Sequence, residues 1–181
     1  VASGGEGPPL IPAFDEAFFG GGIVRALQNI GGMANVTVVG RGLEPLAFDT
    51  GPGNCLIDLA VRRASRGRLR LDDHGRLARR GRIDHRMVER LWHHPYFRLP
   101  PPKSTGRELF NERWLRETLG TRYAAVPEDA LATLTYFTAY SIVESLRRFA
   151  PHRLRELIVS GGGVRNRPQM DHVTRLAAPH R

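Results

Sequence analysis

The chain has 181 residues, 41% of them hydrophobic and 25% charged, which excludes a disordered or fibrous protein and suits one domain or one lobe of a larger protein. No stretch approaches the roughly 20 apolar residues of a membrane span. One cysteine excludes a disulfide framework, and with no signal-like start it favours the cytoplasm. The net charge is +9, and Lys103 is the only lysine. We interpret the arginines as solvated charges scattered over the surface, because few aromatic residues accompany them that could stack on bases.

The first ordered unit is predicted to contain three strands and a helix. Apolar runs over residues 22–30 and 36–39 flank the glycine turn 29–32, a pattern typical of a β-hairpin. A third strand over 46–48 leads into the polar loop 49–54. The helix that follows carries its apolar side chains on one face.

The middle of the chain is predicted to be helical, with long polar connections. Arginine and glycine dominate residues 62–82, which we interpret as the end of a helix followed by turns. Asp84 is a favourable N-cap for a helix that ends before Pro95. A stiff loop with three successive prolines occupies 95–106, and another helix is predicted over 107–118.

The last third returns to the sheet. The clearest helix begins at Pro127, with acidic residues in its first turn, and ends before Pro151. Residues 157–159 are predicted to form a buried strand, which leads through a glycine turn into a short helix within 167–181. The expected fold is α/β, a mixed sheet that opens with an antiparallel β-meander and has helices packed on it.

Four glycine-rich or polar loops are the main candidates for chemistry: 4–7, 29–32, 49–54 and 160–166. Glycine lets backbone N–H groups approach phosphate oxygens, and a helix N-terminus adds a favourable partial charge. One such loop is more often a plain turn, but four of them favour a phosphate site. None is a Walker A motif or a complete dinucleotide fingerprint.

The order of these segments resembles a known family. The hairpin 26–37 is similar to the second phosphate loop of the actin, sugar-kinase and 70-kDa-chaperone ATPases. Together with 48–54, 100–108, 160–166 and the opening loop 4–14, it resembles anhydro-N-acetylmuramic acid kinase over nearly the whole chain.

The resemblance implies a bacterial cytoplasmic kinase of cell-wall recycling. Such an enzyme opens the 1,6-anhydro ring of anhydro-N-acetylmuramic acid and phosphorylates O6 with ATP and Mg²⁺, giving N-acetylmuramic acid 6-phosphate. The implied fold is a ribonuclease-H-like sheet in one lobe of a two-lobed enzyme. Residues 1–20 would be an inter-lobe substrate segment and 21–181 the nucleotide-binding second lobe, truncated at its C-terminal end. The implied partners are the sugar and ATP, with no membrane, no specific nucleic acid, and a homodimer in the full-length protein.

Carried onto this sequence, the resemblance predicts two sets of site residues. The nucleotide and phosphate set is Asn29, Gly31, Gly32, Asp49, Thr50, Gly51, Gly53, Asn54, Gly161, Gly162, Gly163 and Asn166, with Asp49 also as the metal ligand. The substrate set is Gly4, Gly5, Gly7, Lys103, Ser104 and Thr105. Several assignments have structural alternatives. Asp49 and Asn166 could instead cap the helices that follow them, the residues of 51–54 and 161–163 could form plain turns, and Lys103, Ser104 and Thr105 could anchor a stiff loop.

The sequence also departs from the family pattern. The family's first phosphate loop has no counterpart here, and its catalytic base is expected immediately upstream of Val1. No residue of this chain is therefore a catalytic candidate, and the 181 residues are expected to be an inactive fragment. Two other functions stay open, a non-enzymatic nucleotide- or sugar-binding module and an arginine-rich nucleic-acid binder.

Overall fold

A four-stranded mixed sheet forms the centre of the computed structural model, which describes residues 23–120, 127–152 and 154–178. Its strand order is β3-β2-β1-β4. Strands β1 (Val24–Ile30), β2 (Met33–Val39) and β3 (Leu46–Pro52) are antiparallel neighbours, and β4 (Leu154–Ser160) runs parallel to β1. The predicted α/β class and the opening β-meander are confirmed.

The strand β3 is longer than the sequence indicated. We expected it to end at Phe48, but its pairing with β2 continues to Pro52. A proline lacks the N–H that a central strand needs, yet β3 lies at the edge of the sheet, where a proline is tolerated. Asp49, Thr50 and Gly51 therefore belong to a strand and not to a loop.

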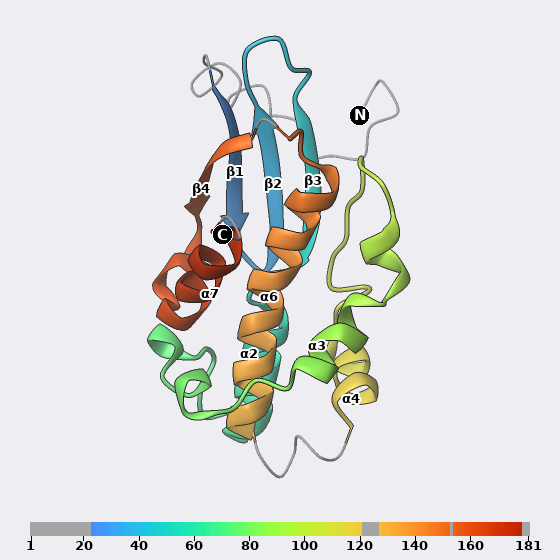
Figure 1. Ribbon diagram of the computed structural model, residues 1–181. Coiled ribbons are helices and arrows are strands. Elements are labelled where there is room, and N and C mark those ends of the chain that lie inside the picture. Colours follow the sequence, from blue (N-terminus) through green and yellow to red (C-terminus); the bar gives the residue numbers. More distant parts are fainter. Residues whose placement is uncertain (1–22, 121–126, 153, 179–181) are drawn as a thin grey trace.

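Within the described residues five α-helices accompany the sheet: α2 (Cys55–Ala64), α3 (His85–Trp92), α4 (Glu112–Leu119), α6 (Pro127–Phe149) and α7 (Arg167–Ala177). Figure 1 shows α6 along one face of the sheet with α7 beside it, and α2, α3 and α4 toward the lower end. Of the helices described, none combines the length and the apolar character needed to cross a membrane.

Side-chain caps set the starts of α3 and α4. The Asp84 carboxylate accepts a hydrogen bond from the Met87 amide at 3.1 Å, so the predicted N-cap of α3 is confirmed. The helix expected over 107–118 begins only at Glu112, because the Asn111 side chain caps it by accepting from the Trp114 amide at 3.0 Å.

The core has two parts, and α6 belongs to both. One part lies between α6 and the sheet and includes Ile30, Val36 and Ile142. The other lies among α2, α3, α4 and the first half of α6, around Phe97 and other apolar side chains. This double contact explains why α6 is buried on most of its circumference.

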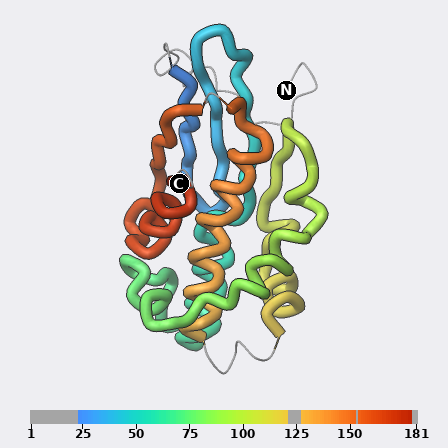
Figure 2. Tube along the Cα trace, in the orientation of Figure 1, coloured from blue at the N-terminus to red at the C-terminus, as the bar shows by residue number. Residues whose placement is uncertain are grey.

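Aromatic rings fill the second part of the core. Trp92 lies 4.8 Å from Phe97, Phe97 lies 5.9 Å from Phe110, and Phe110 lies 5.2 Å from Trp114, measured between ring centroids. Tyr96 contacts both phenylalanines edge-on. In Figure 2 the yellow-green segment around residue 100 runs beside β3, and the Asp49 amide of β3 donates to the Lys103 carbonyl at 3.0 Å.

Candidate phosphate-binding site

The turn between β1 and β2 is fastened to the start of α2. The amides of Gly53 and Cys55 donate to the Gly32 carbonyl, each at 3.0 Å, and the amide of Asn54 donates to the Gly31 carbonyl at 2.8 Å. A Cβ at Gly53 would overlap the Gly31 carbonyl, so this close approach requires glycine. The amides of residues 53–55, where α2 begins, thus hold the glycine turn in place.

The turn that follows β4 meets the same place. Gly161 has a φ of +88°, and a Cβ there would overlap the Asn29 side chain and lie 2.7 Å from the Ile30 carbonyl oxygen. A Cβ at Gly163 would overlap the Ile30 side chain, and one on the glycine between them would lie 3.9 Å from the Asn54 side-chain nitrogen. The structure therefore brings together three of the predicted segments, 29–32, 49–54 and 160–166, at one end of the sheet.

Asn166 caps the last helix. Its side-chain oxygen accepts from the Gln169 amide at 3.2 Å at the start of α7, so the alternative interpretation of Asn166 as a helix cap is confirmed. The side-chain amide of Gln169 is buried behind this turn, and neither its nitrogen nor its oxygen has a hydrogen-bond partner among the described residues.

Thr50 and Gly51 face the interior. The Thr50 hydroxyl donates to the Ala34 carbonyl at 3.1 Å and accepts from the Gln28 side chain at 3.4 Å. A Cβ at Gly51 would lie 2.8 Å from the Phe97 ring. Thr50 therefore links β3 to β2 by a side-chain hydrogen bond, and the lack of a side chain at Gly51 leaves space for the Phe97 ring.

Asp49 is held by the proline-rich segment. Its carboxylate Oδ2 accepts from the Thr105 amide at 2.8 Å, its own amide donates to the Lys103 carbonyl at 3.0 Å, and its carbonyl accepts from the Tyr96 hydroxyl at 2.7 Å. Because Asn54, and not Asp49, is the N-cap residue of α2, the alternative of Asp49 as a helix cap is wrong. Burial raises the pKa of Asp49 above its ordinary value, while the Thr105 hydrogen bond opposes the rise and Glu108 adds to it.

Lys103 occupies an aromatic cage and is only 8% exposed. Its Nζ lies 4.8 Å from the ring centroids of Tyr96 and Phe149 and 5.9 Å from that of Phe48, and it donates to the Tyr96 carbonyl at 3.5 Å. Burial lowers the pKa of Lys103 to about 8, with a further contribution from Arg148. The geometry is that of an anchor for the stiff loop, as the alternative interpretation of Lys103 expected.

Of the remaining substrate candidates, Ser104 is exposed and Thr105 is half-buried. They lie beside Asp49, so the structure joins the predicted metal ligand to the predicted substrate segment. The calls on Gly4, Gly5 and Gly7 lie outside the described residues.

Sequence reasoning missed three polar residues of this region. Tyr96 holds the Asp49 carbonyl, and Gln28 donates to the carbonyls of Asn29 and Asn35 at 3.1 and 2.8 Å, which braces the hairpin. Gln169, with its unpaired buried amide, is the third. The available signal was a glutamine at a buried position of an otherwise apolar strand or helix face, which is uncommon.

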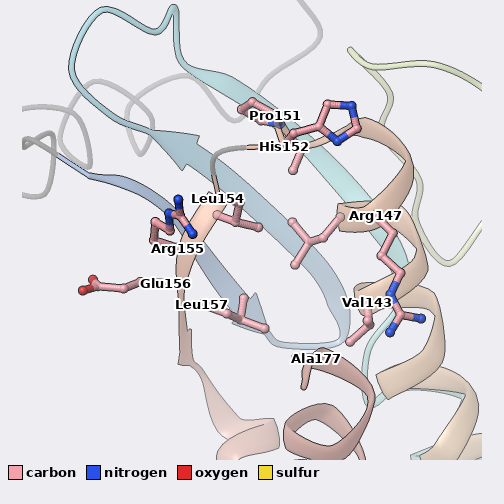
Figure 3. A pocket seen from close by; sticks show the side chains of 11 residues that line it. Val143, Arg147, Pro151, His152, Leu154, Arg155, Glu156, Leu157 and Ala177 are labelled. Atoms are coloured by element: carbon pink, nitrogen blue, oxygen red, sulfur yellow. The ribbon is translucent and has the colours of Figure 1, made fainter. Parts of the chain in front are cut away.

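A cavity of about 440 Å³ lies elsewhere, between α6, β4 and the end of α7. In Figure 3 Val143, Leu154 and Leu157 point into it, whereas Glu156 points away. Within the part of the chain that the structure describes, none of the glycine-turn residues lines this cavity. It is separate from the candidate site.

The mixed sheet, with three turns gathered at one end, is compatible with a kinase-type lobe of an α/β protein. The family model of anhydro-N-acetylmuramic acid kinase matches residues 1–179, and the chain belongs to this family. The resemblance seen in the sequence is thereby confirmed.

Curated relatives support the same assignment. The chain is 45% identical over 168 residues to an anhydro-N-acetylmuramic acid kinase of Streptomyces coelicolor, covering 92% of this chain and 42% of the relative. It is 42% identical over 175 residues to that of Saccharophagus degradans, covering 96% and 46%. For the enzyme of Synechococcus elongatus the identity is 45% over 174 residues, covering 92% and 46%. The chain thus spans less than half the length of these relatives.

Proposed function

We propose that these residues serve an ATP-dependent kinase that opens the 1,6-anhydro ring of anhydro-N-acetylmuramic acid and phosphorylates O6. Membership in a family whose relatives carry this kinase name supports the proposal. The observation that carries it is the meeting of the hairpin turn, the start of α2 and the turn 161–163 at one end of the sheet. Backbone amides in such turns are suited to phosphate oxygens.

Within this site we propose two layers. Asn29, Gly31 and Gly32 face the β- and γ-phosphates, and the turn 161–163 takes the adenosine and α-phosphate side. Gly53 and Asn54 act from behind, because their amides hold the hairpin turn in its position. Three further residues support the site structurally. Asn166 caps α7, and Thr50 and Gly51 pack within β3.

Asp49 is the proposed metal ligand. Mg²⁺ in kinases is commonly bound by one or two carboxylates together with phosphate oxygens and water, and Asp49 offers one carboxylate fixed by the Thr105 amide. The described residues hold no cluster of three or more His, Cys, Asp or Glu side chains that could bind a metal ion by itself, so Asp49 is proposed to act together with phosphate oxygens and water. When bound, the ion would neutralise charge on the transferred phosphoryl group.

The reaction divides between this chain and the rest of the enzyme. A water attacks the anomeric carbon, the bond from that carbon to O6 breaks, and O6 then displaces ADP from the γ-phosphate. We propose that Ser104 and Thr105, with Gly4, Gly5 and Gly7, line the sugar side, and that Lys103 acts by anchoring their loop. The base that activates the water is proposed to lie outside these 181 residues, so a polypeptide limited to them should not turn over substrate.

Four further parts of the proposal rest on the family resemblance. They are a two-lobed whole protein, a ribonuclease-H-like topology for this lobe, a homodimer, and a cytoplasmic location. The antiparallel β1–β3 meander with β4 parallel to β1 supports the second of them.

Calorimetric titration with ADP and Mg²⁺ tests the nucleotide site. Gly162→Asp places a carboxylate where phosphate is expected, and an added Cβ has room there, since its nearest neighbour lies 3.9 Å away. We expect Gly162→Asp to abolish binding and the neutral, equally large Gly162→Asn to retain most of it. Equal binding by both variants would show that the nucleotide does not lie on this turn.

A further inference from the structure

Positive charge is concentrated in one segment. Residues 62–90 contain eleven arginines and four acidic residues, which gives them a net charge of +7 out of +9 for the whole chain. All eleven arginines are exposed. The arginines are solvated, as expected from the sequence, but a large share of the net charge lies in this one segment and is not scattered over the surface.

The acidic residues of this segment do little to neutralise it. The Asp72 carboxylate is buried and accepts from the amides of Leu77 and Ala78 at 2.8 and 2.9 Å, and Asp84 caps α3. Of the eleven arginines, Arg76 alone forms an ion pair with another described residue, Asp73. The segment thus presents nearly its full positive charge to the solvent.

Two leucines are exposed within the same segment. Leu69 is 45% and Leu71 is 55% exposed. Hydrogen bonds hold the backbone up to the first leucine: the Leu69 amide donates to the Ser65 hydroxyl at 2.9 Å, and the Gly67 amide donates to the Arg62 carbonyl at 2.7 Å. An ordered turn therefore presents Leu69 to the solvent, and Leu71 follows two residues later. Residues 62–71 are called the arginine–leucine loop below; its arginines are Arg62, Arg63, Arg66, Arg68 and Arg70.

We propose that the arginine–leucine loop binds the surface of an anionic lipid bilayer. Guanidinium groups suit the lipid phosphates because they donate in a fixed fork, and each basic side chain near such a surface adds to the attraction. Leu69 and Leu71 enter the boundary between headgroups and acyl chains. The proposed contact is with one leaflet only. The expectation of no membrane partner was based on the lack of a spanning segment, and a contact with one leaflet needs no such segment.

Nucleic acid explains the same segment less well. The phosphate backbone of a nucleic acid could pair with the arginines, but it offers no apolar surface that would bury the two exposed leucines. Residues 62–91 contain no phenylalanine, tyrosine or tryptophan that could stack on a base. The pairing of exposed leucines with arginines is what favours the bilayer.

The proposed surface lies apart from the phosphate site. The glycine turns contact the start of α2, whereas the arginine–leucine loop begins in its last turn, with Arg62 and Arg63. Ten helical residues span about 15 Å, and Figure 1 shows α2 extending from the hairpin turn to the lower end of the molecule. Lipid binding and nucleotide binding can therefore be measured independently.

Co-sedimentation with lipid vesicles tests the proposal on the 181-residue chain. We expect binding to vesicles of equal parts phosphatidylglycerol and phosphatidylcholine, none to phosphatidylcholine alone, and a decline as salt rises. The triple variant Arg63→Gln, Arg66→Gln, Arg70→Gln should bind about tenfold more weakly or worse. The control triple Arg41→Gln, Arg98→Gln, Arg155→Gln removes the same charge from exposed positions outside the segment and should lose much less.

A matched pair tests the leucines. Leu71→Ser should weaken vesicle binding severalfold, whereas Leu99→Ser, at a position 50% exposed outside the segment, should not. Thermal melts confirm that each variant is folded, and the comparison of the two vesicle types with the unaltered chain needs no variant at all. Equal losses in the two arginine triples, or an unchanged Leu71→Ser, would overturn the proposal. So would duplex DNA binding that is tighter than vesicle binding at physiological salt and indifferent to Leu71→Ser.

Discussion

Raising the pH from 8 to 10.5 should stabilise the folded chain through one side chain, Lys103. Burial in the aromatic cage lowers the pKa of Lys103 to about 8 from its ordinary 10.5. Below pH 8 the amine is protonated in both the folded and the unfolded state. Between the two values the folded state has released the proton and the unfolded state still binds it, so the free energy of unfolding rises with pH. Above 10.5 the gain is complete, and it is lost as the pH falls through 8.

The size of this effect follows from the same two values. At about 1.4 kcal/mol per pKa unit, the difference corresponds to roughly 3 kcal/mol. The rings of Tyr96, Phe149 and Phe48 stabilise the ammonium form, each cation–π contact contributing about 0.5–2 kcal/mol. These contacts reduce the gain, so we expect at most about 3 kcal/mol between pH 8 and 10.5.

Urea unfolding, followed by circular dichroism at a series of pH values, measures the gain. Tyr96 and Tyr140 have raised pKa values and oppose it at high pH, so the quantity to compare is the difference between the unaltered chain and Lys103→Met, which keeps the cage filled. Because the chain has one lysine, ¹³C-lysine labelling gives a single side-chain resonance whose titration reports this pKa directly. A midpoint near 10.5, or the same pH slope in Lys103→Met, would refute the reasoning.

Three substitutions test the frame of the site by urea unfolding. Tyr96→Phe removes the hydrogen bond to the Asp49 carbonyl and should lower the free energy of unfolding by about 0.5–1.5 kcal/mol; no change would mean that the bond is absent in solution. Asp84→Ala should lose about 1 kcal/mol and Asp84→Asn much less, since asparagine also caps helices. Gly161→Ala, at a φ of +88° and in close contact, should lose more than about 2 kcal/mol, whereas Gly162→Ala should be nearly neutral; equal effects would contradict the geometry of this turn.

Local signals predicted most of the elements. The glycine turn between two apolar runs gave the β1–β2 hairpin, Asp84 gave the start of α3, and Pro127 with the acidic residues after it gave the start of α6. Each of these depends on residues within one turn or one strand pair, so the sequence alone carries the information.

Long-range contacts could not be predicted in this way. The strand β3 extends to Pro52 because β2 pairs with it. Residues 49–52 contain no local pattern that predicts this pairing. The cage around Lys103 takes rings from positions 48, 96 and 149, which nothing in the local sequence joins. The hydrogen bond between the Tyr96 hydroxyl and the Asp49 carbonyl is also a long-range contact and could not be predicted. The sequence therefore identified Asp49 as a candidate without showing which residues hold it.

The aromatic part of the core gives the chain a spectroscopic reporter. Both of its tryptophans, Trp92 and Trp114, pack into the layer that contains Phe97 and Phe110. Tyr96 contacts the two phenylalanines, and its hydroxyl holds Asp49. Tryptophan emission therefore monitors the segment that positions this carboxylate. A shift in emission when a ligand is added would register a rearrangement around Asp49, while binding confined to the glycine turns would leave the spectrum unchanged.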